Sequence, residues 1–206
     1  LVIQFSNLTL WPSRRYPIFK FVLLLDICCN SIRMLMSGAF KIVPRVRYID
    51  ISWNKIKFFG VFVFYNLFSL EKLVCTGNNV KQIVQGTFGK LLSLHTLMLE
   101  NLGLTDLNQG AFIGLDNVLT INLSQNQILK IESYMLVGLL KIEKLLLYGN
   151  EIRYFDMDIL NKFGKLQYVD SGAYEVCCIQ APVIHCAVQH HWPACQRLLP
   201  DVILRV

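Results

Sequence analysis

The residues best suited to chemistry gather near the C-terminal end of the chain. Four of the seven cysteines come after residue 176, together with His185, His190 and His191. Thiols in this setting can form disulfides or, with histidines, ligate zinc. No Cys-x-x-Cys pair is present and adjacent cysteines are poorly placed on one tetrahedral ion, so we expect disulfides and no metal site. The candidates, with three possible pairings, are Cys177, Cys178, Cys186 and Cys195.

Catalytic motifs are absent from the sequence. It contains no glycine-rich phosphate loop, no H-E-x-x-H and no G-x-S-x-G. No acidic residue lies close in sequence to the three C-terminal histidines. We therefore predict that the chain is not an enzyme and needs no cofactor.

Composition excludes further classes of protein. The chain has 206 residues and a formal net charge of +6, which is too small for a dedicated nucleic-acid binder. With 54% hydrophobic and 17% charged residues it is not a disordered chain. The most apolar window, residues 19–29, contains Lys20 and Asp26 and is shorter than the roughly 18 residues of a membrane span. We expect no transmembrane helix within these residues.

A 24-residue repeat defines the elements that must position the functional side chains. The pattern L-x-x-L-x-L-x-x-N-x-L occurs six times over residues 22–165, with Leu102 in place of one asparagine. The asparagines are Asn30, Asn54, Asn78, Asn126 and Asn150. A second column, ten residues later, contains Phe40, Phe64, Phe88, Phe112, Leu136 and Leu160. Such a period is typical of a solenoid.

Each column has a physical role in a stack of coils. The L-x-L phrase predicts a short strand with one buried face, and the asparagine amide can satisfy backbone groups where the chain turns inward. The phenylalanines fill the back of each coil. At Leu102 we expect a local irregularity in the asparagine column. Residues 1–21, with Leu8, Tyr16 and Phe19 at repeat positions, are predicted to form an incomplete first coil.

The repeat resembles the leucine-rich repeat family. This resemblance implies an α/β fold, a right-handed horseshoe with a parallel β-sheet on its concave face. After a seventh coil that begins and breaks, residues 166–200 are predicted to form a cysteine-rich cap over the last coil.

Polar and aromatic side chains occupy the concave positions of the predicted strands. Asp26 and Asp50 lie one coil apart beside Tyr48 and Trp53, and Glu100 lies farther along. Carboxylates and an aromatic anchor are suited to binding a basic peptide or protein hormone. An ordinary solvated sheet face is the alternative interpretation.

The C-terminal stretch resembles the hinge of leucine-rich-repeat G-protein-coupled receptors of the relaxin-receptor type. The matching residues are Tyr174, Cys177, Cys178, Cys186, Cys195, Leu198 and Leu199, whereas His190, His191 and Arg197 depart from the family's acidic residues. The resemblance implies a hormone-binding ectodomain at the plasma membrane that signals through a G protein, with residues 201–206 starting a truncated membrane helix.

Two alternatives remain open, a secreted or matrix leucine-rich-repeat protein and a Toll-like receptor ectodomain. The sequons at Asn7 and Asn122 indicate candidate glycosylation sites, which agrees with an extracellular location in either case.

Overall fold

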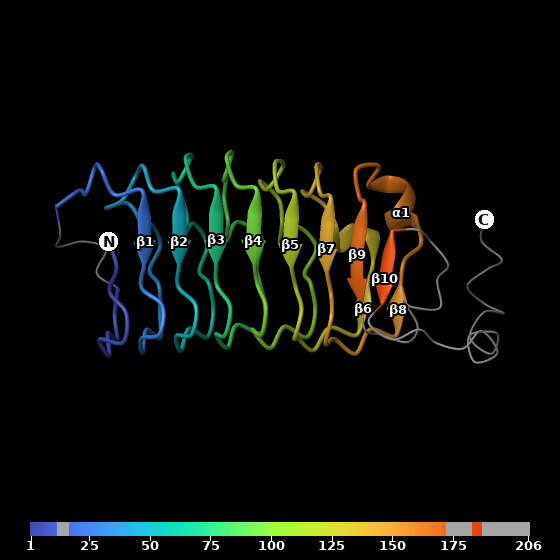
Figure 1. Ribbon diagram of the computed structural model, residues 1–206, viewed down its shortest axis with the longest axis horizontal. Helices are drawn as coiled ribbons and strands as arrows, with labels where there is room; N and C mark the ends of the chain where they lie inside the picture. The colour runs from blue at the N-terminus through green and yellow to red at the C-terminus, as the bar shows by residue number, and fades with distance from the viewer. Residues whose placement is uncertain (12–16, 172–182, 187–206) are drawn as a thin grey trace.

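The computed structural model describes residues 1–11, 17–171 and 183–186. Its main element is a parallel sheet of eight strands that follow one another in chain order (Figure 1). The strands are β1 (Leu24–Asp26), β2 (Tyr48–Asp50), β3 (Lys72–Val74), β4 (Thr96–Met98), β5 (Thr120–Asn122), β7 (Lys144–Leu146), β9 (Tyr168–Ser171) and β10 (Ile184–Cys186). Each coil of the chain contributes a strand to the stack. The predicted leucine-rich-repeat solenoid is confirmed.

The other side of the coils consists mainly of turns. Its regular elements in the described part of the chain are a two-stranded parallel sheet and two short helices. They are β6 (Lys130–Ile131), β8 (Tyr154–Phe155), the 3₁₀ helix η1 (Ser133–Leu136) and α1 (Asp158–Lys162). The α component of the fold is therefore small within residues 1–11, 17–171 and 183–186.

Strand burial follows the repeat. In β1, β2, β3, β4, β5 and β7 the middle residue is buried, and the residues on either side reach solvent. The middle residues, all 0% exposed, are Leu25, Ile49, Leu73, Leu97, Ile121 and Leu145. The period of two along a strand separates a packing face from a face free for binding.

The asparagine column forms a hydrogen-bond ladder between coils. The Nδ2 of Asn54 donates to Ile27 O of the preceding coil at 3.0 Å and to Ile51 O of its own coil at 3.1 Å. Its Oδ1 accepts the Ile32 N–H at 3.0 Å. The same bonds recur at Asn30, Asn78, Asn126 and Asn150. The ladder satisfies backbone groups that the stacking of coils removes from water.

Leu102 interrupts this ladder without disturbing the sheet. Its side chain is 0% exposed, and β4 keeps the same register with β3 and β5 as the other strand pairs. Asn101 is exposed and has the positive φ that also occurs at Trp53 and Gln125 in other coils. The predicted irregularity is thus confined to hydrogen bonding.

Sharing of acceptors explains why the interruption is tolerated. Cys75 O still accepts from Asn78 at 2.8 Å, and Leu99 O from Asn126 at 2.9 Å. Only the acceptor for the buried Val80 N–H is lost, because no hydrogen bond of this group occurs within the described residues. A single missing asparagine leaves each carbonyl with one donor.

Aromatic rings stack behind the sheet. Phe40 and Phe64 have ring centroids 5.4 Å apart, and Phe64 and Phe88 6.0 Å apart, with nearly parallel planes. Trp11 continues the stack onto Phe40 at 6.2 Å. Tyr16, which the repeat spacing placed there, lies outside the described residues. Trp11 therefore covers the N-terminal end of the aromatic column.

The first residues add an incomplete coil to the sheet edge. Leu1 O accepts the Asp26 N–H at 2.8 Å, and the Ile3 N–H donates to Asp26 O at 2.7 Å. The Leu8 N–H donates to Asn30 Oδ1, as the repeat position of Leu8 predicts. This coil covers the edge of β1, which would otherwise expose unpaired backbone groups.

The C-terminal end of the sheet contains one strand, β10, that the repeat spacing did not predict. β9 belongs to the seventh coil. β10 pairs with β9 in parallel, with Ile184 opposite Val169. Cys186 ends β10, whereas Cys177, Cys178, Cys195 and residues 201–206 lie outside the described residues. In the described ranges no helix has the length and apolar character needed to cross a membrane.

The shared acceptors predict non-additive effects of asparagine removal. Ile51 O accepts from both Asn54 and Asn78, so either single Ala variant leaves it one donor, and the double variant leaves it none. We expect the double variant to lose about 1–3 kcal/mol more unfolding free energy than the sum of the singles. Urea denaturation measures each value.

The control pairs Asn54→Ala with Asn150→Ala, which share no acceptor. These two should add to within about 0.5 kcal/mol. Additive losses for the adjacent pair as well would contradict the ladder's shared-acceptor design.

Candidate functional site

The concave face presents two rows of side chains, one on each side of the buried strand residues. Strand pairing aligns Leu24, Tyr48, Lys72, Thr96, Thr120, Lys144 and Tyr168 in one row. It aligns Asp26, Asp50, Val74, Met98, Asn122, Leu146 and Asp170 in the other. Neighbouring members of a row are one strand spacing apart, about 4.8 Å.

The carboxylates of Asp26 and Asp50 lie on paired strands and are held by local donors. Asp26 Oδ1 accepts the Cys28 N–H at 3.0 Å, and its Oδ2 accepts Gln4 Nε2. Asp50 Oδ1 accepts the N–H and the hydroxyl of Ser52, at 2.8 and 2.5 Å. A carboxylate has about four acceptor positions, so each group keeps capacity for a further donor.

A hydrogen bond from Tyr48 to Asp50 connects the two rows. The Tyr48 hydroxyl donates to Asp50 Oδ2 at 3.1 Å. Burial, and next the charge and hydrogen bond of Asp50, raise the pKa of Tyr48 to about 12. Lys72, on the next strand, places its Nζ 5.6 Å from the centroid of the Tyr48 ring. The acidic surface therefore ends at a cation on the β3 side.

Trp53 stands at the turn that follows β2. Its backbone φ is 52° and its side chain is 55% exposed. The indole packs against Gly77 of the next coil, where a Cβ would stand 2.5 Å from Trp53 Cε3. Contact with a bare backbone holds the ring in place, and this reduces the entropy it would lose on binding a partner.

The structure does not place Glu100 with the other predicted residues. Glu100 follows β4, and its Oε2 accepts from Asn122 Nδ2 at 3.2 Å. The side chains of Val74 and Met98 stand between Asp50 and this pair in the same row. We define the acidic patch as Asp26, Tyr48, Asp50 and Trp53, with Glu100 about two strand spacings away.

Two side-chain contacts on the sheet, one at each end, were not recognised from the sequence. Gln4, which holds Asp26, lies 24 residues before Cys28, so the repeat spacing offered a signal for its position. His185 stacks on Tyr168 with centroids 4.3 Å apart at the far end of the sheet. No repeat spacing relates these two rings, and β10 was not predicted.

The described cysteines other than Cys186 carry free thiols. Cys75 is fully buried in the core, as its repeat position predicts, and burial raises the pKa of its thiol. Cys28 and Cys29 have sulfur atoms 3.1 Å apart beside Asp26. Burial is also the main cause of the raised pKa of Cys28. Within the part of the chain that the structure describes, no group of three or more His, Cys, Asp or Glu could hold a metal ion.

Comparison with known proteins supports the repeat assignment. A family model described as leucine rich repeat matches residues 92–152. None of the curated proteins matches the chain.

A solved structure from the Toll–Spatzle complex, described as a molecular hub in Drosophila development and innate immunity, is similar to this chain. The TM-score is 0.63 at 20% sequence identity, and the match covers 74% of this chain. It covers only 20% of the other chain, so the present sequence corresponds to about a fifth of that protein's length. The stacked parallel coils, their asparagine ladder and these matches identify the fold as a leucine-rich-repeat solenoid.

Proposed function

We propose that this chain is a non-enzymatic, extracellular protein-binding module that captures a basic peptide or protein segment on its acidic patch. The observation that carries the proposal is the pairing of Asp26 and Asp50 on adjacent strands beside the exposed ring of Trp53. Both carboxylates are fixed by local donors, so they lose little freedom on binding.

The patch favours a particular ligand chemistry. A guanidinium or ammonium group between the two carboxylates makes charge-assisted hydrogen bonds, which are roughly twice as strong as neutral ones. An apolar or aromatic neighbour in the ligand packs on Trp53, in keeping with the enrichment of tryptophan at binding hot spots. Lys72 repels a cation on the β3 side. The ligand we propose therefore carries a positive charge and an apolar side chain close together.

The finer proposal is a hormone receptor of the relaxin-receptor type at the plasma membrane. It is supported by the resemblance of Tyr174, Cys177, Cys178, Cys186 and Cys195 to the hinge of those receptors. On this proposal Cys177, Cys178, Cys186 and Cys195 form the disulfides of the hinge, and a membrane domain beyond Val206 contacts the G protein.

Two other settings fit the same binding surface. A secreted or matrix protein would use the patch without signalling. A Toll-like receptor ectodomain gains support from the shared fold with Toll, which was solved in complex with Spatzle. In all three the concave face is the proposed contact.

Peptide selection tests the patch through the ligands that the protein itself enriches. Random displayed peptides selected on the wild-type protein should become enriched in Arg or Lys next to aromatic or apolar residues. The enriched peptides should bind Asp50→Asn and Trp53→Ala at least tenfold more weakly, because each variant removes one part of the patch. Thr120→Ala, on the same face three strands from β2, is the matched control. Equal affinity for all four proteins would refute the proposed site.

Glycosylation tests the extracellular setting. Asn7 is exposed, whereas Asn122 is half-buried with its amide bonded to Glu100 and Ser124. After secretion from eukaryotic cells, we expect a glycosidase-sensitive mobility shift that Asn7→Gln abolishes and Asn122→Gln leaves intact. A shift that depends on Asn122 would argue against a ligand contact near Glu100.

The transcript downstream of Val206 separates the receptor from its alternatives. Seven apolar spans, each of about 20 residues, are expected for a G-protein-coupled receptor. A stop codon within a few residues would contradict the receptor proposal and leave the secreted module. A single apolar span would favour the Toll-like alternative.

A further inference from the structure

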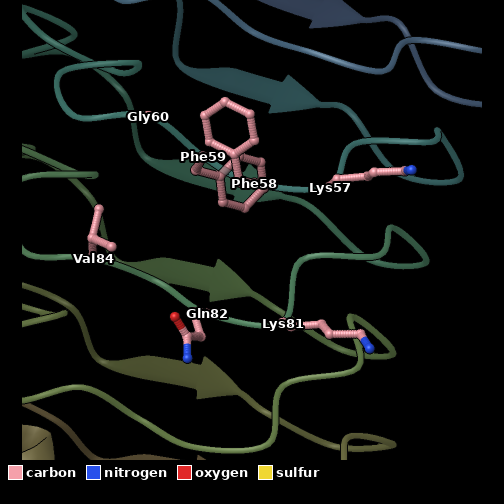
Figure 2. A pocket seen from close by; sticks show the side chains of 7 residues that line it. All are labelled: Lys57, Phe58, Phe59, Gly60, Lys81, Gln82 and Val84. Carbon is pink, nitrogen blue, oxygen red and sulfur yellow. The ribbon is translucent and has the colours of Figure 1, made fainter.

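A groove lies on the turn side of the coils, away from the acidic patch. It runs between the coil that follows β2 and the coil that follows β3, and it has a volume of about 540 Å³ (Figure 2). Its lining consists of Lys57, Phe58, Phe59, Gly60, Lys81, Gln82 and Val84. This volume falls within the range of small-molecule sites, about 300–1,000 Å³.

Gly60 keeps the groove open. The same repeat position carries Met36 in the preceding coil and Val84 in the following one. Gly60 does not have a positive φ, so its backbone conformation does not require glycine. A Cβ there would stand 3.8 Å from Val63 Cγ2 and 3.9 Å from Phe58 Cε2, which is ordinary contact. The missing side chain therefore leaves space rather than relieving strain.

The walls and floor of the groove are apolar. Phe59 is only 2% exposed and packs into the core, so it forms a fixed floor. Phe58 and Val84 are 53% and 41% exposed, which is large for apolar side chains. Contact with an apolar ligand would remove this surface from water, which favours binding.

Two lysines on adjacent coils lie at one end of the groove. Lys57 and Lys81 occupy the same repeat position in adjacent coils, and Figure 2 shows their ammonium groups extending in the same direction, away from Val84. Neither lysine forms an ion pair with a described residue. Residues 51–70 and 72–99 contain no Asp or Glu. The charge at this end is therefore uncompensated by these two coils.

We propose that the groove binds a single-chain anionic amphiphile, such as a fatty acid or an alkyl phosphate. The alkyl chain lies along Phe58 and Val84 over Phe59 and fills the space at Gly60. The carboxylate or phosphate lies between the ammonium groups of Lys57 and Lys81. One cationic end and one apolar end match such a molecule better than a purely apolar or purely anionic one.

This site is independent of the acidic patch. It is lined by residues of the segments that follow β2 and β3 and by none of the acidic-patch residues, and it takes a ligand of opposite charge. Weaker peptide binding by Asp50→Asn therefore does not test the groove. Absence of amphiphile binding in the groove likewise leaves the proposed peptide-binding function intact.

Calorimetric titration with dodecanoate and with monododecyl phosphate, each below its micelle concentration, tests the proposal. We expect one molecule per chain, and no binding of acetate or inorganic phosphate. Gly60→Met should weaken binding at least tenfold, because the new side chain would occupy the space that Gly60 leaves open; adjacent coils carry Met36 and Val84 at this repeat position. The double variant Lys57→Gln, Lys81→Gln should weaken binding by a similar factor. The two probes distinguish a carboxylate from a phosphate headgroup.

The matched control is the double variant Lys41→Gln, Lys90→Gln, which removes the same charge away from the groove and should bind like wild type. Far-ultraviolet circular dichroism checks that every variant folds. Absence of binding, or binding that Gly60→Met leaves unchanged, would overturn the proposal. So would binding to phosphatidylserine vesicles or to polyglutamate without binding of the soluble amphiphiles, because these would identify a membrane surface or an acidic protein as the partner.

Discussion

Backbone pairing of the strands, supported by the hydrogen bonds of the asparagine ladder, holds the coils in register and thereby sets which residues lie side by side on neighbouring strands. Each rung joins a coil to the one before it through a carbonyl acceptor such as Ile27 O and an amide donor such as the Ile32 N–H. This bonding fixes the 24-residue period in space, so residues 24 apart lie on adjacent strands. Asp26 and Asp50 are therefore strand partners. Lys57 and Lys81, which are also 24 residues apart, therefore lie on adjacent coils.

In the first coils of the solenoid the acidic side chains lie on the sheet side, where Lys72 also lies. The acidic residues in the first 100 positions, Asp26, Asp50, Glu71 and Glu100, all belong to the strands or to residues next to them. Lys55, Lys57 and Lys81 lie in the segments that leave the sheet. A chain whose net charge is only +6 can therefore offer an acidic surface to one partner and a basic groove to another.

Sequence reasoning predicted what the repeat controls and missed what lies outside it. The strand register, the burial of Leu25 and its equivalents, and the adjacency of Asp26 and Asp50 follow from counting by 24. The contact of Gln4 with Asp26 exists only because the first residues pair with the edge of β1. The ring that covers Phe40 comes from Trp11, whereas the repeat spacing placed Tyr16 there. The groove at Gly60 arises from an absent side chain, which a search for conspicuous residues passes over. β10 lies only 15 residues after its partner in β9, so no repeat spacing predicts it.

Hydrogen–deuterium exchange with a basic peptide selected on the wild-type protein is the decisive test of concave-face binding, because it locates the contact without a substitution. We predict slower amide exchange confined to the concave strands β1 and β2 and to the turn that contains Trp53. The change should vanish at high salt, since charge pairing drives the contact. Protection on the turn side of the coils, with β1 and β2 unchanged, would contradict the assignment of this face as the binding surface.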